Sequence, residues 1–448
     1  MTTSASIEAP DSTKIVVKGH EITWSTLPAL VADRAVRYGD RQALEIDGQT
    51  LTYREIDEVS ARLAAGISAL GLRKGDIAGG LMANCIESVL CFFACARLGV
   101  IWAPLNVSLV GQDLAYALRD SAPKLIVVDR ENAGKFQDAA VASAVACPLF
   151  GIGLVAGLTP FAELQSHARP VPSVELGPGD PAIVIYTGGT TGMPKGVVLP
   201  QFAVICGGLR TVETLGLKPD DNYLSISQLF HVGGLFCGVI GPMIAGAHGT
   251  IERRFSLSNY WRRVRETKAT LIDMIGATMA LLCREPPSSQ DRDHAVRASL
   301  SIATGVPPHV PREFAARFGI KLINLYSLSE AGGTMIVRNT PDSPKPESHG
   351  KSWGWAEIGI QDSLGRSLPP NATGEIVLRP NYPFIFMLGY LNNPERTVET
   401  FANCWLHTGD LGYLDEEGYL YFRGRRTHWL RRKGENISAH EVESILSQ

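Results

Sequence analysis

The segment YTGGTTGMPKG, residues 186–196, is composed of residue types that bind phosphate. Its four glycines let backbone N–H groups approach an anion closely, its three threonines supply hydroxyl donors, and Lys195 supplies a positive charge. The segment directly follows the apolar run PAIVIYT, so these donors lie at the end of an expected strand. The common G-x-x-x-x-G-K-S/T loop does not fit, because Pro194 precedes the lysine and Gly196 follows it. A flexible surface loop is the alternative, and the position after a buried strand favours a phosphate site.

Three single residues further along the chain carry groups that could act in the same chemistry. Glu330 ends the segment YSLSE, Asp410 ends HTGD, and His231 lies in FHVGG. A lone loop glutamate is most often solvated, an aspartate in a turn is often a local cap, and a lone histidine is most often a satisfied core residue. Taken one at a time, these residues leave the structural and the functional interpretations open.

The composition excludes some classes of partner. The 448 residues carry a formal net charge of -3, from 42 basic and 45 acidic side chains, so no overall charge attracts nucleic acid or an anionic membrane. None of the eight cysteines forms a C-x-x-C pair, which predicts reduced thiols and a cytoplasmic protein. The first residues lack the features of a secretory signal, and no run reaches about 18 apolar residues, so we expect no transmembrane segment.

The elements that must position the candidate residues are those of an α/β protein. The runs KLIVVD (124–129) and PAIVIYT (181–187) are short, continuous and apolar, as in parallel strands covered on both faces. Such strands alternate with helical patterns, which predicts doubly wound sheets up to about residue 320. Beyond residue 341, short alternating segments with frequent turns predict a β-rich subdomain. Near the amino terminus, the dipeptide at 47–48, Asp-Gly, predicts a hairpin turn.

The chain is predicted to divide near Gly424. Residues 1–424 would form one large domain, and residues 425–448 a basic, turn-like hinge followed by the start of a small second domain that is largely absent.

The segment 186–196 resembles the signature loop of the acyl-adenylate-forming enzymes, which comprise acyl-CoA synthetases, luciferases and peptide-synthetase adenylation domains. Their loop reads Y-T-S-G-T-T-G-x-P-K-G, and this chain matches it except that Gly188 replaces the serine. The resemblance covers nearly everything from Thr26 to the last residue. Seven further motifs follow in the family's order: QLFHVGG (228–234), ATGVPP (303–308), YSLSE (326–330), GEIVLRP (374–380), GYLNNPERT (389–397), WLHTGDLGYLDEEGYLYFRGR (405–425) and GENISAHEVE (434–443).

The resemblance implies a nucleotide site. The glycine-rich loop would cradle the β- and γ-phosphates of ATP, and Glu330 would be the Mg²⁺ ligand. Asp410 would accept hydrogen bonds from the ribose hydroxyls beside Arg425, and Tyr326 would offer its ring to adenine. The implied catalytic residues are Lys195, Glu330 and His231. The implied nucleotide-binding residues are Thr187, Gly188, Gly189, Thr190, Thr191, Gly192, Lys195, Thr304, Gly305, Asn324, Tyr326, Ser327, Ser329, Asp410 and Arg425.

The resemblance also implies a pocket for the acyl substrate next to His231. No acidic residue occurs in HVGGLFCGVIGPMIAG (231–246), whereas peptide-synthetase adenylation domains commonly carry an aspartate in this region to bind an ammonium group. An uncharged apolar or aromatic tail is therefore expected, although each of these residues could equally be core packing. The expected lining is His231, Gly233, Gly234, Leu235, Phe236, Met274, Gly276, Gly305 and Leu328.

The end of the chain departs from the family's pattern. Thr427 and His428 stand at the hinge, where the family usually has Asp or Lys followed by Asp or Glu. Only 24 residues follow Gly424, and the lysine that the family carries near the end of its second domain has no counterpart. We therefore expect a shortened enzyme with impaired adenylation.

The expected function is ATP-dependent activation of a carboxylic acid to acyl-AMP, followed by thioester formation with CoA, in fatty acid metabolism. The expected cofactors are ATP and Mg²⁺, with CoA as co-substrate. Two alternatives stay open: an adenylating domain that feeds a carrier protein, and a nucleotide- or acyl-binding module without turnover. The expected partners are these small molecules and a second copy of the chain in a homodimer, with no nucleic acid.

Overall fold

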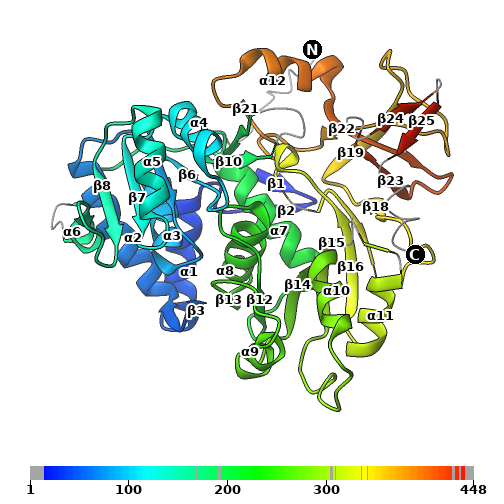
Figure 1. Cartoon of the computed structure of the whole chain (residues 1–448), viewed down its shortest axis with the longest axis horizontal. Helices are drawn as coiled ribbons and strands as arrows, with labels where there is room; N and C mark the ends of the chain where they lie inside the picture. Colours follow the sequence, from blue (N-terminus) through cyan, green and yellow to red (C-terminus); the bar gives the residue numbers. More distant parts are fainter. Residues whose placement is uncertain are drawn as a thin grey trace, which may run out of the picture.

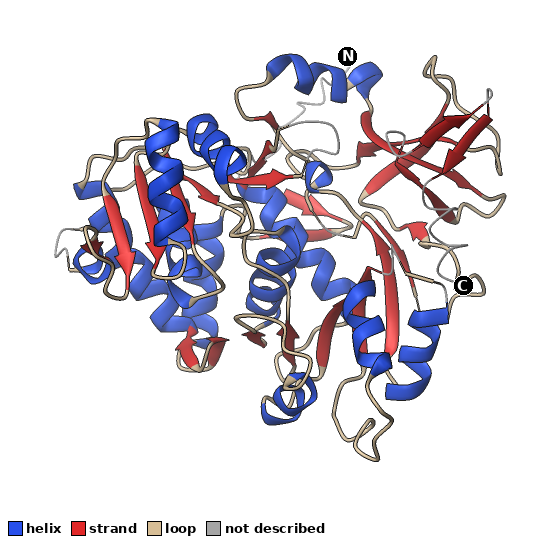
Figure 2. Cartoon of the chain, in the orientation of Figure 1, coloured by secondary structure: helices blue, strands red, loops and turns tan. Residues whose placement is uncertain are grey.

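The computed structural model describes residues 15–166, 170–188, 193–302, 306–307, 309–333, 335–340, 342–425, 429–432 and 435–438. This part of the chain forms two large mixed sheets, a four-stranded antiparallel sheet and two short two-stranded ribbons. The blue and cyan elements from α2 to α6 lie at the left, the green and yellow middle of the chain lies at the centre, and the small sheet lies at the upper right (Figure 1). Helices pack beside the two large sheets (Figure 2). The predicted α/β class with a β-rich subdomain is confirmed.

The first sheet has eight strands in the order β21-β11-β10-β6-β5-β7-β8-β9, and its inner strands are parallel apart from the antiparallel pair β10 and β11. Its strands are β5 (Ile77–Leu81), β6 (Ile101–Pro104), β7 (Leu125–Asp129), β8 (Leu149–Ile152), β9 (Thr159–Pro160), β10 (Pro181–Thr187), β11 (Lys195–Pro200) and β21 (Gly389–Tyr390). The helices of this half are α1 (Leu27–Tyr38), α2 (Tyr53–Ala69), α3 (Ile86–Leu98), α4 (Gly111–Ser121), α5 (Ala133–Ser143) and α6 (Phe161–Gln165).

The second sheet has nine strands in the order β18-β17-β16-β15-β14-β12-β13-β3-β4, with a parallel centre and antiparallel edges. Its strands are β3 (Gln42–Ile46), β4 (Gln49–Thr52), β12 (Asn222–Ser225), β13 (His248–Ile251), β14 (Leu271–Ile275), β15 (Ala298–Ile302), β16 (Lys321–Tyr326), β17 (Val337–Asn339) and β18 (Lys351–Ser352). The helical segments of this half are α7 (Gln201–Leu215), the π-helix η1 (Gly233–Ile240), α8 (Gly241–Ala245), α9 (Tyr260–Glu266), α10 (Gly276–Arg284), α11 (His309–Phe318) and the 3₁₀ turn η2 (Ser329–Ala331).

The small sheet is an antiparallel meander that carries the second half of the candidate site. It has the strand order β19 (Ala356–Gln361), β20 (Gly374–Pro380), β22 (Leu406–Leu414) and β23 (Leu420–Arg425). Between β20 and β22 lie α12 (Pro394–Thr400) and the 3₁₀ turn η3 (Ala402–Cys404). The ribbons are β1 (Ile15–Val17) with β2 (His20–Ile22), and β24 (Trp429–Arg432) with β25 (Glu435–Ser438).

Local sequence accounts for the elements that frame the site. The run PAIVIYT is β10 from its first residue to its last, and its five central residues are buried because helices cover both faces of the sheet. The predicted hairpin turn lies between β3 and β4, where Asp47 and Gly48 have φ values of 52° and 76°. Positive φ at both central residues is what a type I′ turn requires, and Asp-Gly tolerates it.

Parallel strands bring the candidate residues to one side of the molecule. Strands β14, β15 and β16 run parallel, and β10 runs parallel to β6, so the loops that follow them open at the carboxyl edges of the two sheets. Ligands of α/β proteins bind at such edges. Within the described ranges, no helix has both the length and the apolar character needed to cross a bilayer.

Candidate active site

The phosphate-loop segment starts and ends on paired strands. Thr187 ends β10 and faces Lys195, the first residue of β11, in the antiparallel register. The hairpin therefore brings the lysine back beside the start of the loop. The Lys195 Nζ lies 5.4 Å from the centroid of the Tyr390 ring. Desolvation by burial, reinforced by the nearby Arg396 guanidinium, lowers the pKa of Lys195.

A cavity of about 670 Å³ lies between this hairpin, the η2 turn and the small sheet. A cavity of this size can hold a nucleotide. We call it the outer site cavity. It joins predicted residues that are separated by more than 200 positions in the sequence. The predicted residues that line it are Thr187, Gly188, Lys195, Ser327, Leu328, Ser329, Glu330 and Arg425. Gly189, Thr190, Thr191, Gly192, Thr304 and Gly305 lie outside the described residues.

Two lining residues that sequence reasoning did not assign are Tyr390 and Arg396. The Tyr390 hydroxyl donates a hydrogen bond of 2.8 Å to Glu330 Oε1. Arg396, near the start of α12, adds a guanidinium to the wall that carries Lys195. Both belong to the motif GYLNNPERT, so their motif could have marked them, although their contacts could not be read from it.

Glu330 is held in the η2 turn by contacts on both its backbone and its side chain. Its carbonyl oxygen accepts a hydrogen bond of 2.9 Å from Met387 N, and its carboxylate accepts the bond from Tyr390. In the described ranges, no cluster of three or more His, Cys, Asp or Glu side chains could hold a metal ion. A lone carboxylate suits Mg²⁺, which keeps several waters and is bound by one or two carboxylates together with substrate phosphates. The residues therefore fit Mg²⁺ brought with a nucleotide.

The chain after Glu330 needs glycine for a steric reason. Gly332 has a φ of 75°, and a Cβ at this position would lie 2.1 Å from the Ile385 carbonyl oxygen. Just before it, the Ala331 carbonyl accepts a 3.4 Å hydrogen bond from the buried Arg210 guanidinium. This packing fixes the turn that presents Glu330 to the outer site cavity.

Replacing Gly332 with alanine should lower the free energy of unfolding by about 3 kcal/mol, since a left-handed residue with a Cβ costs about 1 to 2 kcal/mol and the backbone clash adds to it. Thermal and chemical unfolding measure this change. Gly418→Ala is the control, because Gly418 has a φ of 82° with open space around the new Cβ. Equal losses in the two variants would show that the contact with Ile385 carries no cost.

The residues predicted to bind the ribose form a hydrogen-bonded group behind the cavity wall. Asp410 on β22 is 5% exposed, and it faces Arg425 across the β22–β23 register. Its Oδ2 accepts a bond of 2.8 Å from the Tyr326 hydroxyl, and its Oδ1 accepts one of 3.1 Å from Arg425 Nε. Burial raises the pKa of Asp410, and Arg425 partly opposes this shift. An ionised carboxylate offers about four acceptor positions, so two remain for other donors.

Other residues of the nucleotide prediction lie further from the outer site cavity. The Tyr326 side chain is buried, its hydroxyl is engaged with Asp410, and its neighbour Ser327 forms the cavity wall instead. The Asn324 side chain donates to Ser348 O at 3.3 Å, and Asn324 is absent from the lining of this cavity. The structure therefore brings Ser327, Ser329 and Arg425 to the cavity surface and places Asn324 in the β16–β17 region.

A second, smaller cavity of about 70 Å³ adjoins the first, and Ser327 lines both. We call it the inner cavity. Of the residues expected around the acyl substrate, Gly233 and Met274 line it. The complete lining is Tyr223, Ser227, Val232, Gly233, Cys237, Asp273, Met274, Ile275, Leu300, Ile302, Leu325, Ser327, Gly333 and Met335. Among these, Asp273 was not found from the sequence.

The other residues of the expected acyl lining lie elsewhere. Leu235 and Phe236 are 2% and 0% exposed and belong to the hydrophobic core. Gly234 packs against the backbone of Gln228, where a Cβ would lie 2.3 Å from the carbonyl oxygen. Gly276 is the first residue of α10, and Leu328 lines the outer site cavity rather than the inner one. The π-helix η1 accounts for this, because its residues from Gly234 to Ile240 are all buried in the protein interior.

His231 precedes η1 and packs against a neighbouring ring. Its imidazole centroid lies 4.6 Å from that of Phe230, and the planes are tilted by 54°. Desolvation lowers the pKa of His231, so the ring is neutral at neutral pH. A neutral imidazole can donate one hydrogen bond, which suits a residue beside a carboxylate substrate.

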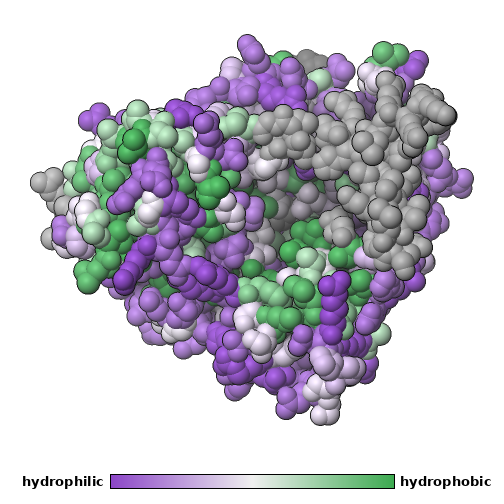
Figure 3. Space-filling view, viewed as in Figure 1, coloured by the Kyte–Doolittle hydropathy of each residue, from purple (hydrophilic) through white to green (hydrophobic). Residues whose placement is uncertain are grey.

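The mouth of the inner cavity is apolar. Ile275 and Ile302, at the carboxyl ends of β14 and β15, are 47% and 42% exposed. Hydrophobic residues gather on this face of the molecule, next to the residues drawn in grey (Figure 3). Exposed apolar side chains that gather in one patch often mark a binding surface.

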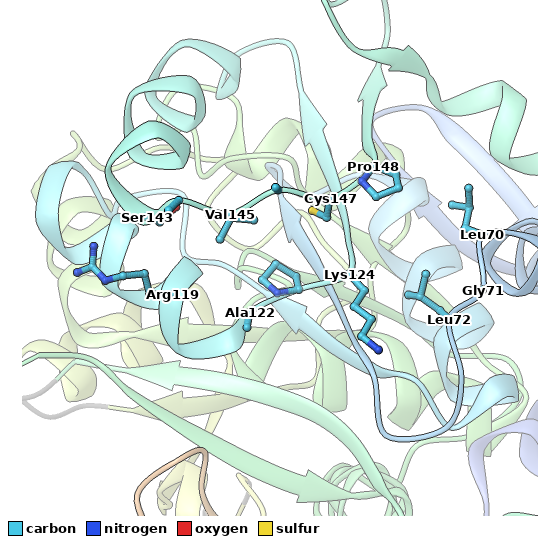
Figure 4. A pocket seen from close by; sticks show the side chains of 13 residues that line it. Leu70, Gly71, Leu72, Arg119, Ala122, Lys124, Ser143, Val145, Cys147 and Pro148 are labelled. Carbon is cyan, nitrogen blue, oxygen red and sulfur yellow. The ribbon is translucent and has the colours of Figure 1, made fainter.

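A separate cavity of about 520 Å³ lies in the amino-terminal half, between the end of α2 and the helices α4 and α5 (Figure 4). None of the predicted site residues lines it. Burial raises the pKa of its Cys147 thiol to about 11, so the thiol stays protonated at neutral pH and is a poor nucleophile. Its Lys124 is paired with Asp76 at 2.7 Å.

The predicted hinge lies largely outside the described residues. This applies to Thr427 and His428, whereas β24 and β25 form a short antiparallel ribbon from Trp429 to Ser438.

The two α/β sheets, the small sheet and the cavity between them define an adenylate-forming enzyme. The family model for AMP-binding enzymes matches residues 31–391, and the chain belongs to this family. Among its relatives is the crotonobetaine/carnitine–CoA ligase of Escherichia coli, which is 30% identical over 428 residues that cover 93% of this chain and 83% of the relative. The relatives described here are acid–CoA ligases.

Solved structures of the family share the fold. The O-succinylbenzoate coenzyme A synthetase of Bacillus subtilis, in complex with ATP and a magnesium ion, is 28% identical with a TM-score of 0.81, over 93% of this chain and 83% of that one. A fatty acyl-CoA synthetase of Mycobacterium tuberculosis is 26% identical with a TM-score of 0.82, over 94% of this chain and 82% of that one.

Proposed function

We propose that this chain is an acyl-CoA synthetase that activates a carboxylic acid with ATP and then transfers the acyl group to CoA. In the first step a carboxylate oxygen attacks the α-phosphorus of ATP, the bond to the β-phosphate oxygen breaks, and pyrophosphate leaves. In the second step the CoA sulfur attacks the acyl carbon, its proton is lost, and AMP leaves. The observation that carries the proposal is the outer site cavity, which is lined by Lys195, Glu330 and Arg425 together.

The charges in this cavity match the needs of the first step. Two unit negative charges, such as a carboxylate and one charged phosphate oxygen, repel by about 4 kcal/mol at about 4 Å when the effective dielectric is near 20. Lys195, Arg396 and Arg425 line this cavity and supply positive charge to it. Glu330 would hold Mg²⁺ with phosphate oxygens, and the ion would neutralise charge on the leaving pyrophosphate. Lys195, which follows the glycine-rich loop, would bind phosphate oxygens of ATP.

The two cavities separate the roles of the acid and the nucleotide. Ser327 lies at their junction, so a carboxylate placed there has its tail in the inner cavity and the nucleotide in the outer one. The inner walls are mainly apolar, and the small volume favours a compact organic tail. His231 lies outside the lining of both cavities, so the arrangement assigns it no contact with the carboxylate. We propose ATP and Mg²⁺ as cofactors and CoA as the thiol substrate.

The proposed function is tested by measuring pyrophosphate release from ATP with a panel of carboxylic acids, with and without CoA. Release that requires an acid, and an acyl-CoA product when CoA is added, are the expected results. Release with an acid but no thioester with free CoA would point to a carrier-protein thiol instead. ATP binding without acid-dependent release would indicate a binding module.

Replacing Lys195 with alanine should weaken ATP binding about tenfold, because one charge-assisted hydrogen bond to phosphate contributes about 1.5 kcal/mol or more. Calorimetric titration with ATP measures the change. Lys124→Ala is the matched control, since it removes an amine paired with Asp76 in the separate cavity. Unaltered ATP affinity in the Lys195 variant would rule out the proposed phosphate contact.

A further inference from the structure

The inner cavity contains one charged residue among its described lining residues, Asp273. It lies in the middle of β14, whose sequence is LIDMI, between the apolar residues Ile272 and Met274. Its neighbours Ile272 and Met274 are buried, whereas the Asp273 side chain remains partly exposed and lines the cavity. A charged side chain in a parallel strand is unusual, since such strands are buried on both faces.

Asp273 is fixed in place by donors from the neighbouring strand. Ile226 N donates to Oδ1 at 3.0 Å, and the Ser225 hydroxyl donates to Oδ2 at 3.1 Å. The Ser227 hydroxyl also donates to Oδ2. These neutral donors orient the carboxylate, and no lysine, arginine or histidine pairs with it among the described residues.

The carboxylate is therefore a negative charge in a mainly apolar cavity. Placing such a charge away from water is costly unless a positive charge or further donors compensate. Burial raises the pKa of Asp273, which reports the same cost. A bound group of positive charge would relieve it.

A second polar group in the lining is also without a partner. The Tyr223 side chain is fully buried, and its hydroxyl has no hydrogen-bond partner among the described residues. Buried hydroxyls are normally paired, so this oxygen is available to a ligand in the inner cavity.

We propose that the acid activated by this enzyme carries a positively charged nitrogen in its tail, and that Asp273 selects it in the inner cavity. This inference rests on the proposed function and narrows its substrate class. The carboxylate end of the acid lies at Ser327, next to the nucleotide, and the cationic end lies at Asp273. The expectation of an uncharged tail is based only on residues 231–246, which contain no acidic side chain. The acidic side chain of the inner cavity, Asp273, belongs to β14 instead.

The experiment compares acids that differ only in charge. One pair is the γ-trimethylammonium derivative of butanoate and the analogue in which carbon replaces the nitrogen. The other pair is δ-aminovalerate and hexanoate, which have a terminal ammonium and a methyl group respectively. The kcat/KM of acid-dependent pyrophosphate release should be about tenfold or more higher for at least one cationic acid than for its neutral partner.

The two pairs distinguish the kinds of cation. A primary ammonium can donate hydrogen bonds to both Asp273 and Tyr223, so Tyr223→Phe should reduce the preference for δ-aminovalerate. A trimethylammonium group has no N–H, so the same variant should leave the preference for the other cationic acid unchanged. Either pattern supports the proposal.

Replacing Asp273 with asparagine should abolish the preference for the cation. Asparagine keeps the size of the side chain and an oxygen for Ile226 N, so the strand contacts can persist. The control is Asp129→Asn, which changes a buried aspartate that accepts bonds from Ala83 N and Asn132 N in the other sheet. Its preference ratio should equal that of the unmodified enzyme.

Equal or higher kcat/KM for both neutral acids in the unmodified enzyme would overturn the proposal, whether or not the Asp273 variant folds. A cation preference that persists in a folded Asp273→Asn variant would also overturn it. Both outcomes leave the ligase function standing, because neutral acids are still activated. Release with none of these four acids would also overturn this inference, whereas the ligase function is decided separately by the wider panel of carboxylic acids.

Discussion

Replacing Glu330 with glutamine should reduce acid-dependent pyrophosphate release by about 100-fold or more. The substitution keeps the side chain's shape and its acceptor for the Tyr390 hydroxyl, but it removes the negative charge that would hold Mg²⁺ against the phosphates. A metal ion stabilises transition-state charge by several kcal/mol, and about 1.4 kcal/mol corresponds to a factor of ten in rate. Single-turnover pyrophosphate release at fixed Mg²⁺ concentration measures the loss.

A second measurement separates metal binding from a general disturbance of the site. The Mg²⁺ concentration needed for tight ATP binding, followed by calorimetry, should increase in the Glu330 variant. Tyr390→Phe is the control, because it removes the hydrogen bond to Oε1 and leaves the charge in place. Its effect should be smaller. Loss of activity in the Glu330 variant with an unchanged Mg²⁺ dependence would contradict the assignment of Glu330 as the metal ligand.

Much of the fold could be predicted because the local sequence and the tertiary contacts favour the same structure. The continuous apolar run PAIVIYT became β10 with the bounds that the sequence indicated, and KLIVVD (124–129) became β7 without its first residue. The Asp47-Gly48 turn formed the hairpin for the same reason, since few other residues adopt two positive φ values. The resemblance added the order of the site motifs, and the outer site cavity joins residues from five of them.

The parts that could not be predicted depend on packing between distant elements. Asp273 is a single polar residue in a mostly apolar strand, and the sequence does not show which cavity that strand borders. The bond between the Tyr326 hydroxyl and Asp410 spans 84 positions and depends on how the small sheet rests against the second sheet. The π-helix η1 had no signal in an all-apolar run, so the side chains of Leu235 and Phe236 were assigned to the pocket rather than to the core.

The hydrogen bond between Tyr326 and Asp410 gives Asp410 a structural role besides ribose binding, and mutation can separate the two roles. It accepts bonds from Tyr326 and Arg425, and it keeps acceptor positions that ribose hydroxyls could use. Tyr326→Phe removes one of the protein donors without touching the carboxylate. If Asp410 acts mainly to join the two sheets, this variant should lose stability and ATP affinity together. If Asp410 binds the ribose, stability and affinity should separate.

Replacing Asp410 with asparagine should weaken ATP binding about 100-fold, because hydrogen bonds to a charged group contribute about 1.5 to 3 kcal/mol each and asparagine offers one oxygen instead of two. Calorimetry with ATP and with ribose-modified deoxy-ATP measures this. The loss should be largest for ATP and small for the deoxy nucleotide, which lacks one of the hydroxyls. Because burial raises the pKa of Asp410, ATP affinity of the unmodified enzyme should fall as the pH is lowered toward that pKa, and the asparagine variant should lose this dependence. Equal losses for ATP and the deoxy nucleotide would show that Asp410 stabilises the sheet contact rather than the ribose.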